Sequence, residues 1–173
     1  IAASGLGLRS CLLRVLERYR SEYPYVRICL INNFTQRDLA AVQNGLADFA
    51  LVPDVADAPD SLIRKQVGQV WVIPICGSAF SELTKGNVTL AQLVDLPLIS
   101  LSEGTSTYNF YADFFLRHGL PYSPDVEVAT IDQVLPVVRC NLGIGFVPHE
   151  MLVGSSEQTG IYPLTLEEPI TPR

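Results

Sequence analysis

Residues 26–52, VRICLINNFTQRDLAAVQNGLADFALV, are the stretch of this sequence that decides the fold class. Residues 26–31 form an apolar run that predicts a strand, and residues 48–52 form another. Between them, Thr35 begins a helical segment that runs through Asn44, and Gly45 follows where a C-terminal cap is expected. Because a strand, helix and strand in this order pair in parallel, the stretch predicts a parallel sheet covered by helices.

The same alternation extends on both sides of this stretch. Upstream, the first residues predict a strand and residues 7–22 an amphipathic helix. Downstream, residues 62–75 are extended in character, and a second cycle then begins. It predicts helices at 89–94, 108–118 and 130–140, strands at 97–101, 126–129 and 144–147, and a return strand at 162–166.

Two such αβ halves joined by extended segments predict two lobes with a cleft between them. The chain would cross between the lobes near residues 70 and 148. Lobe I would then comprise residues 1–70 plus 148–173, and lobe II residues 71–147. In open α/β sheets, ligands bind outside the carboxyl ends of the strands, where helix N-termini meet.

Three of the predicted helices open with a threonine followed three residues later by a side chain that can pair with it. These pairs are Thr35 with Asp38, Thr89 with Gln92, and Thr130 with Gln133. The pattern is typical of a capping box, with Asp as the weaker partner. Each opening is either a plain helix cap or a set of N–H groups that faces a ligand, and for Thr89 we favour the plain cap.

Composition excludes several classes of partner. The chain has 173 residues, a net charge of −6 and only 12 Lys and Arg residues, so it lacks the clustered basic surface that binds nucleic acid. No apolar run reaches the length of about 20 residues that a membrane helix needs. The sequence therefore predicts a cytoplasmic globular protein that makes no contact with a membrane.

Catalytic and metal-binding motifs are not found in this sequence. The four cysteines, Cys11, Cys29, Cys76 and Cys140, stand singly in apolar surroundings, which indicates buried thiols rather than disulfides or metal ligands. The G-x-S-x-G, P-loop and H-E-x-x-H patterns do not occur, and His118 and His149 are expected at the surface. We expect no catalytic residue, metal ion or cofactor.

Four motifs resemble those of one family along the whole chain. They are the Tyr19–Val26 ending of the first helical unit, GLADFALVP from Gly45, VTLAQLVDLPLISL with Leu90, Leu93 and Pro97, and VVRCNLGIGFVPHEM with Gly143, Gly145 and Pro148. The sequence resembles the effector-binding domain of LysR-type transcriptional regulators. The resemblance implies an α/β fold similar to type-2 periplasmic binding proteins, with two αβ lobes, two crossover strands and a small effector in the cleft.

The resemblance also implies partners outside this domain. Regulators of this family carry an N-terminal winged helix-turn-helix, which is absent from this fragment, so DNA would be bound only through that missing domain. Self-association to a dimer or tetramer is implied as well. The first helix, with its apolar stripe, is a plausible face for that pairing.

The family's effector site, carried over to this sequence, comprises hydroxyl side chains and backbone amides after several strands. The predicted ligand-binding residues are Ser4, Gly5, Asn33, Phe34, Thr35, Ser102, Gly104, Thr105, Ser106, Thr130 and Ile131. Open N–H groups and the positive end of a helix dipole favour an anion, so the predicted effector is a small, anionic metabolite.

Two other functions remain open from the sequence. A stand-alone solute-binding protein of the same fold would share these features and differ in what precedes the domain. An enzyme on a related two-lobe fold would require titrating residues in the cleft, and this sequence offers no pattern for them.

Overall fold

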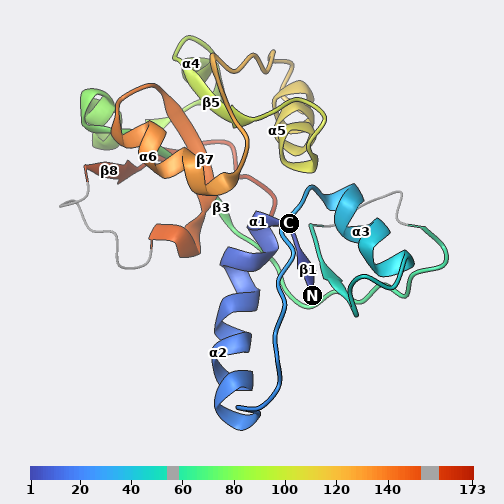
Figure 1. The fold of residues 1–173 in the computed structure, drawn as a ribbon. Coiled ribbons are helices and arrows are strands. Elements are labelled where there is room, and N and C mark those ends of the chain that lie inside the picture. Colours follow the sequence, from blue (N-terminus) through green and yellow to red (C-terminus); the bar gives the residue numbers. More distant parts are fainter. Residues whose placement is uncertain (54–58, 153–159) are drawn as a thin grey trace. The chain divides into compact units, whose positions relative to one another are not determined.

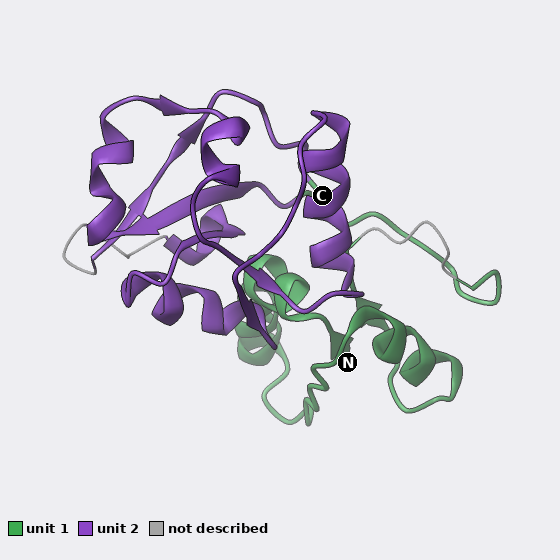
Figure 2. Ribbon diagram, turned by 90° about the horizontal axis from the view of Figure 1, so that it is seen from above, with its two compact units in different colours: residues 1–69, 173 green, residues 70–172 purple. Residues whose placement is uncertain are grey.

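The computed structural model describes residues 1–53, 59–152 and 160–173. The chain divides into two compact units, which Figure 2 distinguishes by colour. Unit 1 comprises Ile1–Gln69 together with Arg173, and unit 2 comprises Val70–Pro172.

Unit 1 contains the strand–helix–strand arrangement that residues 26–52 predict. Strand β1 (Ala2–Ala3) pairs in parallel with β2 (Ala50–Leu51), and Ile31 forms a parallel bridge to Ala2. Helix α3 (Thr35–Gln43) packs on these strands through a small cluster of buried alanines, Ala2, Ala41 and Ala47. The short side chains let the helix lie close to the sheet.

The predicted strand at 26–31 is wrong in its length, because only Ile31 forms a β-bridge. The amino group of Ile1 donates to the Cys29 carbonyl, and the Ile31 N–H donates to the Ile1 carbonyl. Strand β1 thus offers backbone partners only to residues 29–31. Residues 26–28 have the composition of a strand, but no neighbouring strand that the structure describes pairs with them.

One long helix follows β1, in agreement with the predicted amphipathic segment. It is built from α1 (Gly5–Gly7), a π-helical turn at Leu8–Leu12, and α2 (Leu13–Glu22). The side chains of Leu6 and Leu12 are buried, whereas α2 buries none of its residues. In Figure 1 the chain that follows α2 runs back beside this helix, and the apolar side chains Leu13, Val15 and Tyr19 of α2 are exposed.

Unit 2 is built on a mixed five-stranded sheet of order β6-β5-β7-β3-β8 (Figure 1). Its strands are β3 (Val72–Gly77), β5 (Leu98–Leu101), β6 (Val126–Val128), β7 (Ile144–Pro148) and β8 (Ile161–Pro163). Strand β5 runs parallel to β6 and β7, while β3 runs antiparallel to β7 and β8. Two short strands, β4 (Asn87–Val88) and β9 (Thr165–Leu166), form a separate parallel pair.

Helices cover both faces of this sheet. Helix α5 (Ser106–Arg117) contributes Phe114 and Phe115 to a core that also contains α4 (Leu90–Val94) and Phe146. On the opposite face, the 3-10 turn Ile131–Gln133 and α6 (Val134–Arg139) pack against Val147. Neighbouring residues of β7 thus enter different cores, as the alternation of side chains along a strand requires.

The glycines of the LGIG motif are explained by close contacts in unit 2. A Cβ at Gly145 would lie 2.6 Å from Val134 Cγ1 and 2.9 Å from Val138 Cγ2. A Cβ at Gly143, which has a φ of +154°, would collide with the Pro97 carbonyl. Glycine therefore lets α6 lie directly on β7 and lets the turn before β7 pass the start of β5.

The C-terminal segment differs from the predicted lobe boundary. Residues 148–173 were expected in lobe I, but β8 pairs with β3 and β9 pairs with β4, which places residues 160–172 in unit 2. The predicted extended run at 62–75 also differs, since only Val72–Gly77 forms a strand there. Strand pairing between residues far apart in sequence decides both cases.

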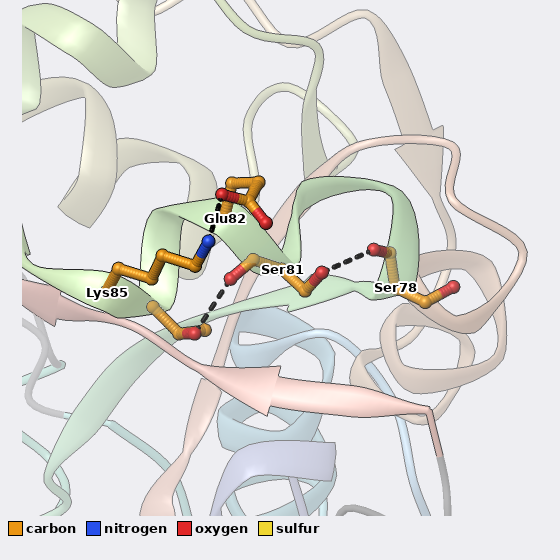
Figure 3. Close-up of polar contacts among 5 residues, drawn as sticks. Ser78, Ser81, Glu82 and Lys85 are labelled. Atoms are coloured by element: carbon orange, nitrogen blue, oxygen red, sulfur yellow. Dashed lines mark hydrogen bonds and ion pairs between the residues drawn. The ribbon is translucent and has the colours of Figure 1, made fainter.

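The sequence analysis made no prediction for residues 78–85, and its expectation for the cysteines is only partly met. Ser78–Lys85 forms a 3-10 helix, in which the hydroxyls of Ser81 and Thr84 donate to the carbonyls of Ser78 and Ser81 and Lys85 pairs with Glu82 (Figure 3). The expectation of buried cysteines is confirmed for Cys76 but wrong for Cys29 and Cys140, which are exposed. Both histidines are exposed, as predicted.

Candidate functional site

The predicted site residues of unit 1 lie at one edge of its sheet. Ser4 and Gly5 follow β1, and residues 33–35 follow the bridge at Ile31. Because β1 and the chain at Ile31 run parallel, their carboxyl ends lie at the same edge. The structure therefore places these five predicted residues at one edge of unit 1.

The side chain and backbone N–H of Ser4 both form hydrogen bonds within unit 1 at this edge. Its Oγ accepts a hydrogen bond of 3.2 Å from the Gly7 N–H, and its own N–H donates to the Leu51 carbonyl at 3.1 Å. A Cβ at Gly7 would lie 2.7 Å from that same carbonyl oxygen, so glycine lets the helix start close to β2. The side chain of Ser4 is thus the N-cap of the first helix, and the helix start is fixed by contacts to β2.

Helix α3 begins one residue earlier than its threonine suggests. Phe34 is the N-cap residue, and the N–H groups of Arg37 and Asp38 both donate to its carbonyl, at 2.9 and 3.1 Å. The predicted capping role of Thr35 is therefore wrong, because Thr35 is the first helical residue. Thr35 is buried while the Phe34 side chain is 51% exposed, and the first turn of α3 supplies the positive end of its dipole at this edge.

Asp38 is a buried acid one turn into α3. It is 0% exposed, and neither carboxylate oxygen has a hydrogen-bond partner within residues 1–53, 59–152 and 160–173. Burial raises the pKa of Asp38 from its ordinary value of 3.8 to about 6, although the side chain and backbone of Asn33 lower it. Asn33 therefore faces the carboxylate without forming a hydrogen bond of good geometry, and desolvation dominates.

Sequence reasoning treated Asp38 only as a capping partner and missed its burial. A signal was present, because Asp38 lies three residues before Ala41 on the helix face that the apolar periodicity turns toward the sheet. An acid at such a position is rarely buried without a partner.

The predicted residues of unit 2 gather at a corresponding edge. Residues 102–106 follow β5, and Thr130 and Ile131 follow β6, which lies beside β5 and runs parallel to it. The turn after β5 contains Gly104 at a φ of +81°, a conformation that favours glycine. This places both groups at the carboxyl edge of the same sheet.

Helix α5 begins at this edge with a capped first turn. The Thr105 N–H donates to the Ser102 carbonyl at 3.2 Å, and Thr105 Oγ1 accepts from the Tyr108 N–H at 3.1 Å. Thr105 is thus the N-cap of a helix of 12 residues. Ser106 is the first residue of this helix and is half-buried. The side chain of Thr105 satisfies the helix start, as a plain cap would.

Thr130 and Ile131 have different surroundings. Gln133 Oε1 accepts from the N–H groups of Ala129 and Thr130, at 2.8 and 3.1 Å, which confirms the predicted pairing of Thr130 with Gln133. Thr130 is exposed, whereas the side chain of Ile131 is buried in the core beneath α6. Only the backbone of Ile131 is therefore suited to contact a polar ligand.

Two buried hydroxyls behind the edge of unit 2 were also missed. Ser100 Oγ and Tyr122 Oη have no hydrogen-bond partner in the described part of the chain. Burial raises the pKa of Tyr122 well above its ordinary value, with Tyr108 adding to the effect and Ser100 opposing it. Neither residue carries a motif that marks it, since Ser100 is read from sequence simply as part of a strand.

The structure thus forms two groups of predicted residues, one at a strand edge of each unit. That the two groups line one shared cleft stays a prediction. In the described ranges, no helix is long and apolar enough to cross a membrane.

Comparison with known proteins identifies relatives over most of the chain. The family profile of the LysR substrate binding domain matches residues 1–173. The HTH-type transcriptional regulator cbl of Escherichia coli K12 is 26% identical over 162 residues, covering 93% of this chain and 51% of the regulator. The chain spans about half the length of the curated regulators it matches.

Solved structures show the same fold. The cofactor-binding domain of the Cbl regulator superimposes with a TM-score of 0.83 at 24% identity, covering 99% of this chain and 75% of that one. The regulatory domain of CcmR from Synechocystis PCC6803, in complex with 2-PG, has a TM-score of 0.82 at 17% identity and covers 99% of this chain and 82% of that one. This is the type-2 periplasmic-binding-protein-like α/β fold that the motifs imply. Given the profile match over the whole chain and this fold, the chain belongs to the LysR substrate-binding domain family, the effector-binding domains of LysR-type transcriptional regulators.

Proposed function

We propose that this domain binds a small anionic metabolite at the two strand edges described above, and that binding controls transcription by the regulator to which the domain belongs. One observation carries the proposal. In each unit, the predicted ligand-binding residues gather at the carboxyl edge of parallel strands beside the first turn of a helix, α3 in unit 1 and α5 in unit 2.

The chemistry of these edges favours negative charge. A helix N-terminus stabilises an anion by about 0.3 to 2 kcal/mol, and the hydroxyls nearby can donate further hydrogen bonds. Structural neighbours bind organic acids: the BenM effector-binding domain is seen with benzoate, and the QuiR domain with shikimate. The proposed effector class is therefore a carboxylate or a phosphorylated acid.

Binding regulates only if it distinguishes two states of the domain. Moving an equilibrium from 1:99 to 99:1 requires about 5.5 kcal/mol of differential affinity. Charge-assisted hydrogen bonds from two helix starts are of the right size to supply it. The interlobe cleft predicted from the sequence would bring both helix starts to one ligand.

The wider context follows from the family. We infer a cytoplasmic regulator that self-associates as a dimer or tetramer and contacts DNA through a winged helix-turn-helix domain. The exposed apolar side chains of α2, among them Val15 and Tyr19, support self-association through this helix. The homologues are transcriptional regulators, so we expect this domain to bind its effector without altering it, and we favour this function over stand-alone solute binding.

A ligand screen tests the proposal. Thermal unfolding would be measured with benzoate, shikimate, sulfate and a panel of other carboxylates and phosphates. A ligand at about 100 times its dissociation constant should add about 2.7 kcal/mol to the free energy of unfolding.

Substitutions then locate the site. Thr35→Ala and Ser106→Ala should weaken the binding of a hit, whereas Thr89→Ala should leave it unchanged. Thr89 is a matched control because its Oγ1 caps α4 by accepting from the Gln92 N–H at 3.2 Å, so its loss costs stability of about 1 kcal/mol without touching either edge. A hit that binds equally well to all three variants would exclude the assigned site.

A further inference from the structure

The α3 edge contains a charged group that the proposed function does not use. Asp38 is fully buried, and both of its oxygens lack a hydrogen-bond partner in the described ranges. Side chains on a helix point toward its N-terminus, and Asn33 faces the carboxylate from that direction. The carboxyl group is therefore directed toward the predicted site residues and not toward the far end of α3.

Among the residues that the structure describes, no charge beside Asp38 balances it. The strands packed on α3 contribute Ala2, Ala3, Ala50 and Leu51, none of which titrates. On α3 itself Arg37 is exposed, and Asp48, before β2, is exposed as well. Within the described residues, burial and Asn33 are what set the proton affinity of Asp38, and no neighbouring cation contributes.

We propose that Asp38 links effector binding to proton uptake: an anion at the first turn of α3 binds more tightly when the Asp38 carboxyl is neutral than when it is ionised. This inference rests on the proposed function, because it requires an anion at that edge. It needs no direct contact between Asp38 and the ligand, which its burial would prevent.

The physical reason is repulsion between two negative charges at short range. Asp38 lies about one helical turn, roughly 5 Å along the axis, from the start of α3. That distance is shorter than the Debye length of about 8 Å in physiological salt, and a buried charge is screened less than a surface charge. An anion bound there would raise the proton affinity of Asp38, and by linkage the neutral form would bind the anion more tightly.

The size of the effect follows from this reciprocity. For each unit by which the bound anion raises the pKa of Asp38, the affinity at low pH exceeds the affinity at high pH by up to about tenfold. Since burial raises the pKa of Asp38 to about 6 in the free domain, the change falls between about pH 5 and pH 8.

Titration calorimetry tests the proposal directly. Benzoate, shikimate and sulfate would be titrated into the 173-residue chain near pH 7 in two buffers of different ionisation enthalpy. Above about pH 5.5 these probes keep their charge, so a difference in apparent binding enthalpy reports protons exchanged by the protein. We expect uptake of a fraction of a proton per bound anion, and an affinity that falls as the pH rises from about 5.5 to about 8.

Variants assign the proton. Asp38→Asn should bind the same probe without proton uptake and with little pH dependence, whereas Asp48→Asn, which changes an exposed acid of the same unit, should behave as the wild type. His149 is the histidine that follows β7, and His149→Gln should retain the uptake.

The outcomes separate the two proposals. If neither these probes nor any anion of the thermal-unfolding screen binds, the anionic effector is refuted and this inference falls with it. If an anion binds without proton uptake, or if Asp38→Asn keeps the uptake, the effector site stands and the role of Asp38 is refuted. Should Asp38→Asn fail to fold, the pH dependence of the wild type compared with His149→Gln still decides.

Discussion

Replacing Asp38 by Asn should remove a pH dependence from the stability of this domain, with no ligand present. The pKa of the buried carboxyl is raised to about 6 in the folded protein, above its ordinary value of 3.8. The folded state therefore holds the proton more tightly than the unfolded state. The stabilising contribution is fully present below about pH 4 and is lost as the pH rises through about 6.

The magnitude follows from the shift of the pKa. A rise of about two units corresponds to a difference on the order of 3 kcal/mol between low pH, where Asp38 is neutral in both states, and about pH 8, where it is ionised in both. Between about pH 5 and pH 8 only part of this range is crossed, so the wild type should lose roughly 1 kcal/mol that the variant keeps.

Urea unfolding followed by circular dichroism at these two pH values measures the difference. Asp48→Asn is the matched control, because Asp48 is exposed in the same unit and should leave the pH dependence of the wild type intact. If Asp38→Asn and the wild type lose the same free energy of unfolding between the two pH values, Asp38 is not the buried, unpaired acid described here.

Three further predictions concern packing and association. Gly145→Ala should lower the free energy of unfolding by about 1 to 3 kcal/mol, because the new Cβ would lie 2.6 Å from Val134 Cγ1; denaturant unfolding measures it, and an unchanged midpoint would contradict the close approach of α6 to β7. Phe115→Ala should cost about 3 to 5 kcal/mol in the same assay, since the ring is 0% exposed, and a loss below about 1 kcal/mol would show that the core is packed differently. Val15→Asp should weaken self-association in sedimentation velocity by placing a charge on a side chain that is 56% exposed on α2, while thermal stability stays near that of the wild type; an unchanged oligomer would exclude this face.

The capping-box pattern in the sequence predicted helix starts correctly where the cap is made by residues close together along the chain. The capping box of Thr89 forms as expected, with the Thr89 N–H donating to Gln92 Oε1 at 2.9 Å. The predicted N-cap role of Thr35 was wrong because a helix can begin at any nearby residue in extended conformation. Phe34 takes the N-cap position without a side-chain cap. Side-chain type favours a cap but does not fix its register.

The candidate site could be predicted only in part. The sequence predicted which segments follow parallel strands, and the structure gathers those of each unit at one edge. It did not predict which hydroxyls are already used, such as Ser4 as an N-cap and Thr105 as another. For Asp38, the spacing to Ala41 indicated the buried helix face, but the complete burial of the carboxyl group without a partner depends on neighbours from distant parts of the chain.

The sequence by itself determined the α/β alternation, the glycines at 143 and 145 and the family, because periodicity, turns and motifs are properties of residues close together along the chain. Only the tertiary structure decided that β3 runs antiparallel within a mixed sheet, that residues 161–166 pair with strands of unit 2, and that Asp38 is sealed from water. These outcomes depend on hydrogen bonds and packing between segments up to about 90 residues apart, whose free energies no local pattern encodes.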